Sequence, residues 1–179
     1  MTVPDRPAPG PGEWVLLSYR LPREPSTPRI MLWRRLKRLG VAQLADGLVA
    51  LPADARTREQ LEWIADEVVE AGGTAGIWLA NPGAATQERH LAETLASARA
   101  DEYRALLEQA SAAANLSPPE RARVVDRLRA ELRRIGKRDY FPPAERDQAR
   151  QAIEDLKRSV DPEHDSASAA DPVDPVGQP

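Results

Sequence analysis

The fold is decided by one stretch near the N-terminus, residues 13–40, which reads EWVLLSYRLPREPSTPRIMLWRRLKRLG. Its first nine residues, 13–21, are apolar on both alternating faces. That pattern is typical of a central strand in a sheet that helices cover. Two prolines then end the strand, and Ser26 or Thr27 can cap a helix that starts at the next proline. The stretch therefore predicts a buried strand followed directly by a helix.

The helix of this stretch shows an apolar repeat. Ile30, Trp33, Leu36 and Leu39 recur at a spacing of three, and we predict that they form its buried face. Gly40 then supplies the left-handed residue that commonly ends a helix. Each main element of this part of the chain carries one tryptophan. Core packing is expected of all four, which are Trp14, Trp33, Trp63 and Trp78.

Two short strands, a second helix and a last strand are predicted next. Asp46-Gly47 between two short apolar runs is a strong hairpin signal. Thr57 is expected to cap the second helix, and the last strand covers residues 74–80. The order strand, helix, strand, strand, helix, strand is typical of the ferredoxin-like arrangement. The sequence therefore predicts an α+β fold, with a ferredoxin-like βαββαβ domain over residues 13–83.

A C-terminal helical arm is predicted over residues 84–160, which are rich in Ala, Glu, Arg and Leu. Ser117 is expected to cap its middle helix. The motif Arg138-Asp139-Tyr140-Phe141 is expected to pack against the sheet. Residues 1–12 are rich in proline and glycine, and residues 161–179 are acidic and lack any hydrophobic period. Both ends are predicted to be disordered.

Composition limits the chemistry that the chain can perform. The sequence contains no cysteine, which excludes disulfides and thiol nucleophiles. Its two histidines, His90 and His164, form no metal or catalytic motif, and no glycine-rich phosphate loop occurs. Neither an enzyme nor a bound cofactor or metal is therefore expected. No apolar run approaches a membrane span, and no secretory signal is evident, so a cytoplasmic protein without a membrane partner is expected.

Positive charge gathers at the first strand–helix junction. The net charge is −3, yet residues 1–40 carry +5 and residues 41–118 carry −7. Arg20, Arg23 and Arg29 surround the turn into the helix. Guanidinium groups match tetrahedral oxyanions, and the free backbone N–H groups of a helix start add to the attraction. These three arginines are the predicted oxyanion-binding residues.

A second basic set lies off the predicted apolar stripe. Its members are predicted to contact DNA phosphates, and the alternative is an ordinary solvated helix face. The set comprises Arg34, Arg35, Lys37 and Arg38. Residues 121–138 are also rich in arginine, but acidic residues are interleaved with them. This interleaving favours a salt-bridged helix in the arm over a phosphate-binding one.

The sequence resembles the N-terminal domain of the chromate resistance protein ChrB family over about residues 13–160. The matching segments are Trp14-Val15-Leu16-Leu17, Tyr19-Arg20-Leu21-Pro22, Glu24-Pro25-Ser26, Arg29, Trp33-Arg34, Leu36-Lys37-Arg38-Leu39-Gly40, Asp46-Gly47-Leu48-Val49-Ala50-Leu51-Pro52 and Arg138-Asp139-Tyr140-Phe141. This family is associated with chromate-responsive transcriptional regulation. The resemblance implies the ferredoxin-like fold, chromate or a similar oxyanion as ligand, and contact with promoter DNA.

Two functions are therefore expected from the sequence and kept open. The first is a regulatory or sensor module that binds an oxyanion and DNA to control chromate-resistance genes. The alternative is a non-catalytic interaction or adaptor protein that keeps the fold without chromate sensing. A homodimer also remains open.

Overall fold

The computed structural model of this protein describes residues 12–160. The predicted disorder of residues 1–12 and 161–179 lies outside the described residues, apart from Gly12. Contacts between residues divide the chain into two compact units. The first runs up to Arg99 and includes the short segment Arg138–Pro142, and the second comprises Ala100–Lys137 and the residues from Pro143 onward.

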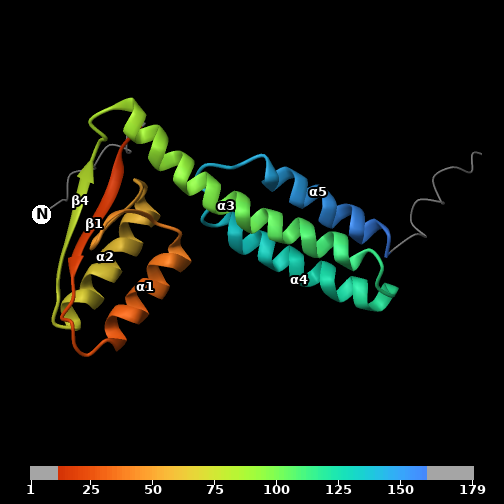
Figure 1. Ribbon diagram of the computed structural model, residues 1–179, viewed down its shortest axis with the longest axis horizontal. Helices are drawn as coiled ribbons and strands as arrows, with labels where there is room; N and C mark the ends of the chain where they lie inside the picture. Colours follow the sequence, from red (N-terminus) through yellow and green to blue (C-terminus); the bar gives the residue numbers. More distant parts are fainter. Residues whose placement is uncertain (1–11, 161–179) are drawn as a thin grey trace, which may run out of the picture. The chain divides into compact units, whose positions relative to one another are not determined.

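A four-stranded antiparallel sheet forms the framework of the first unit, and two helices alternate with its strands along the chain (Figure 1). The strands stand side by side in the order β2-β3-β1-β4. The predicted α+β class is therefore confirmed. In chain order the elements are β1 (Trp14–Arg20), α1 (Thr27–Leu39), β2 (Ala42–Ala45), β3 (Leu48–Pro52), α2 (Ala55–Glu70) and β4 (Thr74–Ala80).

β1 is a central strand, as its sequence predicts. It lies between β3 and β4, and Leu17 pairs with Val49 on one side and with Ile77 on the other. Val15 and Leu17 are fully buried toward the helices, whereas Trp14 is buried in a separate cluster. A strand that is apolar on both faces is stable here because both faces lose contact with water.

The main core of the first unit lies between the sheet and the two helices, which Figure 1 shows on the same side of the sheet. Strand residues alternate in direction, so every second residue of β1 and β3 reaches this core. The helices complete it with side chains at spacings of three and four. The buried members are Val15, Leu17, Leu32, Leu36, Val49, Leu51, Leu61, Ile64 and Val68.

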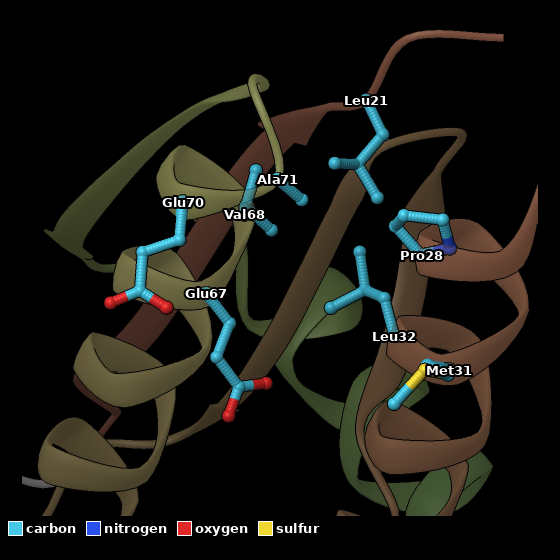
Figure 2. A pocket seen from close by; sticks show the side chains of 8 residues that line it. All are labelled: Leu21, Pro28, Met31, Leu32, Glu67, Val68, Glu70 and Ala71. Atoms are coloured by element: carbon cyan, nitrogen blue, oxygen red, sulfur yellow. The ribbon is translucent and has the colours of Figure 1, made fainter. Parts of the chain in front are cut away.

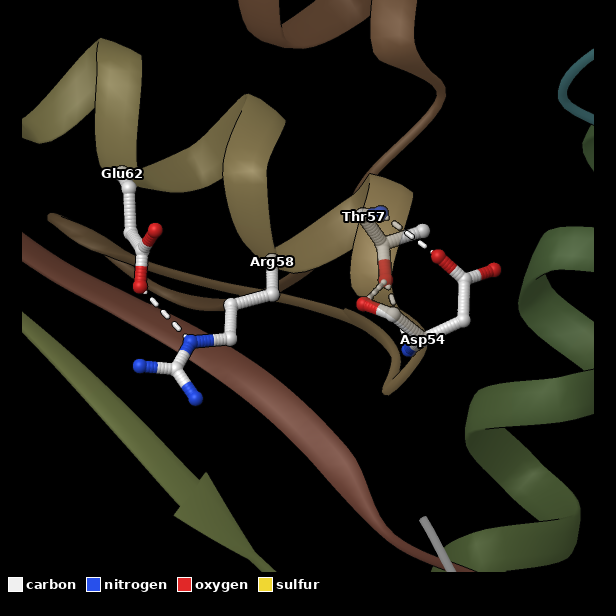
Figure 3. Close-up of polar contacts among 4 residues, drawn as sticks. All are labelled: Asp54, Thr57, Arg58 and Glu62. Atoms are coloured by element: carbon white, nitrogen blue, oxygen red, sulfur yellow. Dashed lines mark hydrogen bonds and ion pairs between the residues drawn. The ribbon is translucent and has the colours of Figure 1, made fainter. Parts of the chain in front are cut away.

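The second helix begins with a reciprocal cap (Figure 3). The backbone N–H of Thr57 donates to the Asp54 carboxylate at 2.6 Å, and the backbone N–H of Asp54 donates to the Thr57 hydroxyl oxygen at 3.0 Å. Asp54 is therefore the N-cap, and the prediction that Thr57 holds this position is wrong. Thr57 occupies the third helical position, from which its hydroxyl also donates to the Pro52 carbonyl at 2.7 Å. Arg58, in the first turn, forms an ion pair with Glu62, and its Nε lies 2.6 Å from the Glu62 Oε1 (Figure 3).

The buried face of α1 differs from the prediction. Leu32 and Leu36 are buried, whereas Ile30 is 48% exposed and Trp33 is 52% exposed. A spacing of three turns a helix by about 300°, so each step falls about 60° behind a full turn. Residues that repeat at three therefore drift around the helix instead of keeping to one face. Leu32 and Leu36, four residues apart, hold their direction better and pack against the sheet.

Three of the four tryptophans are exposed, which contradicts the expectation of core packing. Only Trp14 is buried, and its ring stacks on that of Phe141 with centroids 6.0 Å apart. Trp33, Trp63 and Trp78 are each more than half exposed. The indole N–H of Trp78 donates to the Ser18 hydroxyl at 2.9 Å, which holds that ring along the sheet.

The Tyr140-Phe141 segment packs against the first unit, as predicted. Both rings join the cluster around Trp14 on the second face of the sheet, together with Leu91 and Leu95 of the first part of α3 (Ala85–Ala113). This cluster explains why Trp14 is buried while Trp78, farther along the same sheet, is exposed.

The second unit is helical, as predicted. It contains the last part of α3, α4 (Pro118–Gly136) and α5 (Glu145–Arg158). Ser117 caps α4 as expected, in a capping box with Glu120. The interleaved charges of α4 form ion pairs, Arg134 with Glu131 at 2.9 Å and Arg129 with Glu154 of α5 at 2.8 Å. The buried core comprises Tyr103, Leu106, Ala110, Ala113, Val125, Leu128, Ile135, Ala149, Ile153 and Leu156.

Within residues 12–160, no helix combines the length and the apolar character that crossing a membrane requires.

Candidate anion-binding surface

The predicted anion site lies where β1 ends and α1 begins. Arg20 is the last residue of β1 and is exposed, and Arg29 lies in the first turn of α1. The N-terminus of α1 has no side-chain cap, because Ser26 makes no capping hydrogen bond. Its first-turn N–H groups therefore keep the partial positive charge that attracts anions.

A hollow of about 480 Å³ opens at this junction. Arg20 and Arg29 both line it, so the structure brings together two of the three predicted oxyanion-binding residues. Arg23 is exposed in the connecting loop and is not part of the lining. The complete lining is Tyr19, Arg20, Leu21, Arg29, Leu32, Trp33, Gln43, Asp46 and Gly47.

The β2–β3 turn supplies the far wall of the hollow. The backbone N–H of Tyr19 donates to the Gly47 carbonyl at 2.7 Å, which ties the turn to the end of β1. Gly47 has a φ of 75°, and a Cβ there would lie 2.4 Å from the Tyr19 carbonyl oxygen. Only glycine fits this close approach without strain. The turn thereby places Asp46 on the rim of the hollow.

Tyr19 lines the hollow and carries a phenol that can donate a hydrogen bond when it is protonated. Burial raises its pKa above the ordinary value, and the nearby Asp46 carboxylate raises the pKa further. The phenol is therefore protonated at neutral pH. A bound anion would meet two guanidinium groups and one O–H donor, with one carboxylate opposing it.

The four predicted DNA-binding residues differ in their surroundings. Arg34 and Arg38 are exposed, and among the described residues neither forms an ion pair. Arg35 is partly buried and pairs with Glu67 of α2. The Lys37 ammonium lies over the Trp33 ring, 4.2 Å from its centroid. Arg34 and Arg38 are thus the most available cations of the set.

A second, shallower hollow adjoins the first along α1. Ser26, Arg29, Ile30, Trp33 and Arg34 line it, so Arg29 and Trp33 border both hollows. Sequence reasoning missed Ile30 because it placed this residue in the core, whereas for Trp33 it expected core packing and left open that the tryptophan also borders a ligand pocket. It also missed Asp46, which it used only as a turn signal. The i, i+3, i+4, i+7 spacing of residues 30, 33, 34 and 37 was the signal that could have identified this face.

A third depression separates α1 from α2 and has a different character (Figure 2). Its floor is apolar, and Glu67 and Glu70 of α2 are the charged residues among the part of its lining that the structure describes. Figure 2 shows both carboxylates on the α2 side, with Glu67 extending toward Leu32 and Met31 of α1 and Glu70 pointing away from them. Glu67 is already paired with Arg35, and no basic residue is among the described lining residues of this groove, which distinguishes it from the basic junction.

Comparison with known proteins identifies the family. The model of the family described as "Protein ChrB, N-terminal" matches residues 29–117. "Protein ChrB" of Cupriavidus metallidurans (strain ATCC 43123 / DSM 2839 / NBRC 102507 / CH34) is 30% identical over 152 residues, which cover 83% of this chain and 46% of that protein. The chain therefore spans about half the length of this relative. The matched residues carry most of α1, the strands β2, β3 and β4, and the helices α2 and α3, and by this match and the similarity to Protein ChrB this chain belongs to the ChrB N-terminal domain family.

Proposed function

We propose that this protein is a regulatory module of chromate resistance, and that its basic junction binds chromate or a similar tetrahedral oxyanion. The observation that carries the proposal is that Arg20 and Arg29, nine residues apart in sequence, line one hollow. Two guanidinium groups there offer forked donors to an oxyanion, and the uncapped start of α1 adds a favourable field. Family membership supplies the link to chromate resistance.

A promoter-binding role forms the second part of the proposal. Five basic residues and no acidic residue lie on α1, which gives it the positive field that a phosphate backbone attracts. Arg34 and Arg38 are the main phosphate contacts in this proposal. Lys37 contributes once its ammonium leaves the Trp33 ring, whereas Arg35 contributes less because Glu67 already holds it.

We also infer that the first unit has the ferredoxin-like fold. Its support is the chain order β1-α1-β2-β3-α2-β4, together with two helices on one face of an antiparallel sheet. This fold carries many unrelated functions, so the functional proposal rests on the arginines and not on the fold. The exposed arginines, and not a catalytic group, are the working residues of the proposal.

Thermal unfolding with different anions tests the oxyanion site. Chromate should raise the midpoint more than chloride at matched ionic strength. At a hundredfold excess over its dissociation constant, a ligand that binds only the native state adds about 2.7 kcal/mol. Arg20→Ala and Arg29→Ala should each remove most of this gain. Arg38→Ala is the matched control, because this exposed arginine lies on the same helix but outside the hollow.

The outcome also separates the two functions that the sequence left open. If chromate stabilises the parent and the Arg20→Ala variant equally, the hollow is not the site. If no oxyanion exceeds chloride for the parent protein, the adaptor function replaces the sensor function. Sulfate should be included in the series, because its shape and charge match those of chromate.

A further inference from the structure

The outward face of α1 combines apolar and basic side chains in one row. Residues 30, 33, 34 and 37 stand at i, i+3, i+4 and i+7, so they share one face of the helix. Ile30 is 48% exposed and Trp33 is 52% exposed on this face, which also carries Arg34 and Lys37. Ile30 and Trp33 are one turn apart and form a contiguous exposed apolar patch bordered by basic side chains, which is the kind of surface that can bind a partner.

The charge of this face limits what can cover it. No acidic residue occurs between Thr27 and Leu39, and Arg29 and Arg38 extend the positive charge on both sides of the row. A partner that complements this face is therefore an anion with apolar or aromatic parts. The shallow hollow beside Trp33, which Arg29 and Arg34 border, offers a place for an apolar group between two cations.

We propose that α1 lies in the major groove of double-stranded DNA, with Ile30 and Trp33 against base edges. Arg34, Lys37 and the flanking Arg29 and Arg38 hold phosphates. This inference rests on the DNA contact proposed above and adds the reading of sequence. A helix of 13 residues is about 20 Å long, and a major groove about 12 Å wide admits it. Apolar side chains distinguish thymine there by contact with its methyl group.

Two other occupants fit the same face less well. A second copy of this chain would bring two faces of equal positive charge together, which costs free energy unless anions intervene. An anionic membrane attracts the charge, but helices that lie in membranes separate their apolar face from their cationic face. On the exposed face of α1, apolar and basic side chains are mixed. The separate apolar face of α1, which contains Leu32 and Leu36, is already buried against the sheet. Insertion of Ile30 and Trp33 into lipid would bury Arg34 with them.

The test measures DNA binding of the full chain by fluorescence anisotropy at several salt concentrations. The probes are a duplex from the region upstream of its own gene and a scrambled duplex of equal length and composition. The variants are Trp33→Ala, Arg34→Ala and, as a matched control, Trp63→Ala, which removes a tryptophan that is 57% exposed on α2. Unchanged thermal midpoints verify that each variant folds.

The expected results separate base contact from phosphate contact. Trp33→Ala should reduce the preference for the upstream duplex about five- to tenfold, the lower range for a lost base contact, and leave the salt dependence unchanged. Arg34→Ala should weaken both duplexes equally and lower the log–log salt slope by about one. Trp63→Ala should change neither quantity.

Several results would overturn the inference, and they differ from those that overturn the DNA contact itself. If the parent protein binds both duplexes equally and with a steep salt dependence, the proposed DNA contact stands but the proposed contact with base edges is refuted. Equal preference ratios for Trp33→Ala and Trp63→Ala lead to the same conclusion. A parent protein that binds neither duplex at low salt refutes both proposals. Tighter binding to phosphatidylserine vesicles than to DNA, or a dimer that Trp33→Ala dissociates, assigns the face to a membrane or to a second copy.

Discussion

Helices α1 and α4 are both rich in arginine, yet they use their charge in opposite ways. α1 carries five basic residues and no acidic one, and α4 carries six basic and three acidic residues. On α4, Arg134 and Arg129 form ion pairs with Glu131 and Glu154. On α1, Arg35 alone has such a partner within residues 12–160, and this partner is Glu67. The number of basic residues on a helix therefore does not mark a binding surface. Basic residues without acidic neighbours do mark one.

The N-termini of the two helices differ in the same sense. At the start of α4 the backbone N–H of Ser117 donates to the Glu120 carboxylate at 3.2 Å, whereas the first turn of α1 has no acidic residue and Ser26 makes no capping hydrogen bond. α4 thus has acidic side chains beside two of its arginines and at its N-terminus. α1 leaves most of its basic side chains and its first-turn N–H groups available to an external anion.

The largest expected effect tests which side of α1 faces outward. Leu36→Ala should lower the free energy of unfolding by about 2–5 kcal/mol, because it leaves a cavity beside the sheet. Ile30→Ala should cost less than about 1 kcal/mol, since Ile30 is already half exposed. Urea unfolding followed by tryptophan fluorescence measures this, because all four tryptophans belong to the first unit. Similar losses for the two variants would show that α1 packs on both faces, and the comparison with α4 would fail.

The next effect concerns charge. Replacing Arg34 and Arg38 together by alanine should lower the log–log salt slope of DNA binding by about two, because each phosphate contact contributes nearly one unit. Replacing Arg123 and Arg133 of α4, two exposed arginines, should leave the slope unchanged. Anisotropy titrations at matched protein concentrations measure both pairs. If the α4 pair of substitutions lowers the salt slope equally, acidic residues near a basic helix do not prevent it from contacting phosphates.

A smaller effect is expected from the caps. Ser117→Ala should destabilise the second unit by about 1 kcal/mol, because it removes one half of a capping box. Ser26→Ala should change the stability of the first unit by only a few tenths of a kcal/mol, since no side-chain cap is lost. Circular dichroism at 222 nm reports the first change, and tryptophan fluorescence reports the second. A loss of 1 kcal/mol from Ser26→Ala would reveal a hidden cap on α1.

The smallest effect lies in the hollow beside α1. The raised pKa of Tyr19 means that an unfolded chain releases this proton more readily than the folded chain does. Its contribution to stability is therefore present below pH 10 and is lost as pH rises through the folded pKa. Tyr19→Phe should make the decline of the unfolding free energy above pH 10 shallower. Tyr140→Phe is the comparison variant, because burial also raises the pKa of Tyr140. Identical pH profiles for Tyr19→Phe and the parent would contradict the assigned burial.

The sequence predicted the elements better than it predicted their faces. The central position of β1, the stop at Gly40 and the Asp46-Gly47 turn follow from local rules about alternation and left-handed glycines. These rules act within a few residues, so they can be read without the rest of the fold.

The faces of α1 were not readable in the same way. A helix with apolar residues at 30, 31, 32, 33, 36 and 39 offers several stripes, and only contact with the sheet selects Leu32 and Leu36. The composition of the hollow was also beyond reach, because the β2–β3 turn brings Asp46 to Arg20 through the sheet register. Local sequence rules do not show which residues of the 21–26 loop reach the hollow, and Arg23 is not among those that line it.

Because Phe141 stacks on Trp14, no single truncation of the chain can separate the complete first unit from the second. The second sheet face of the first unit is complete only when Arg138–Pro142 is present, yet Ala100–Lys137 stands between this segment and the rest of the unit. A fragment that ends at Arg99 would leave Trp14 and Leu16 without their aromatic cover. During synthesis, at about 5–20 residues per second, the ribosome must add this intervening stretch for roughly two to eight seconds before the cover can dock. The second face of the nascent sheet therefore stays partly exposed, with its apolar side chains in water, until this segment has been made.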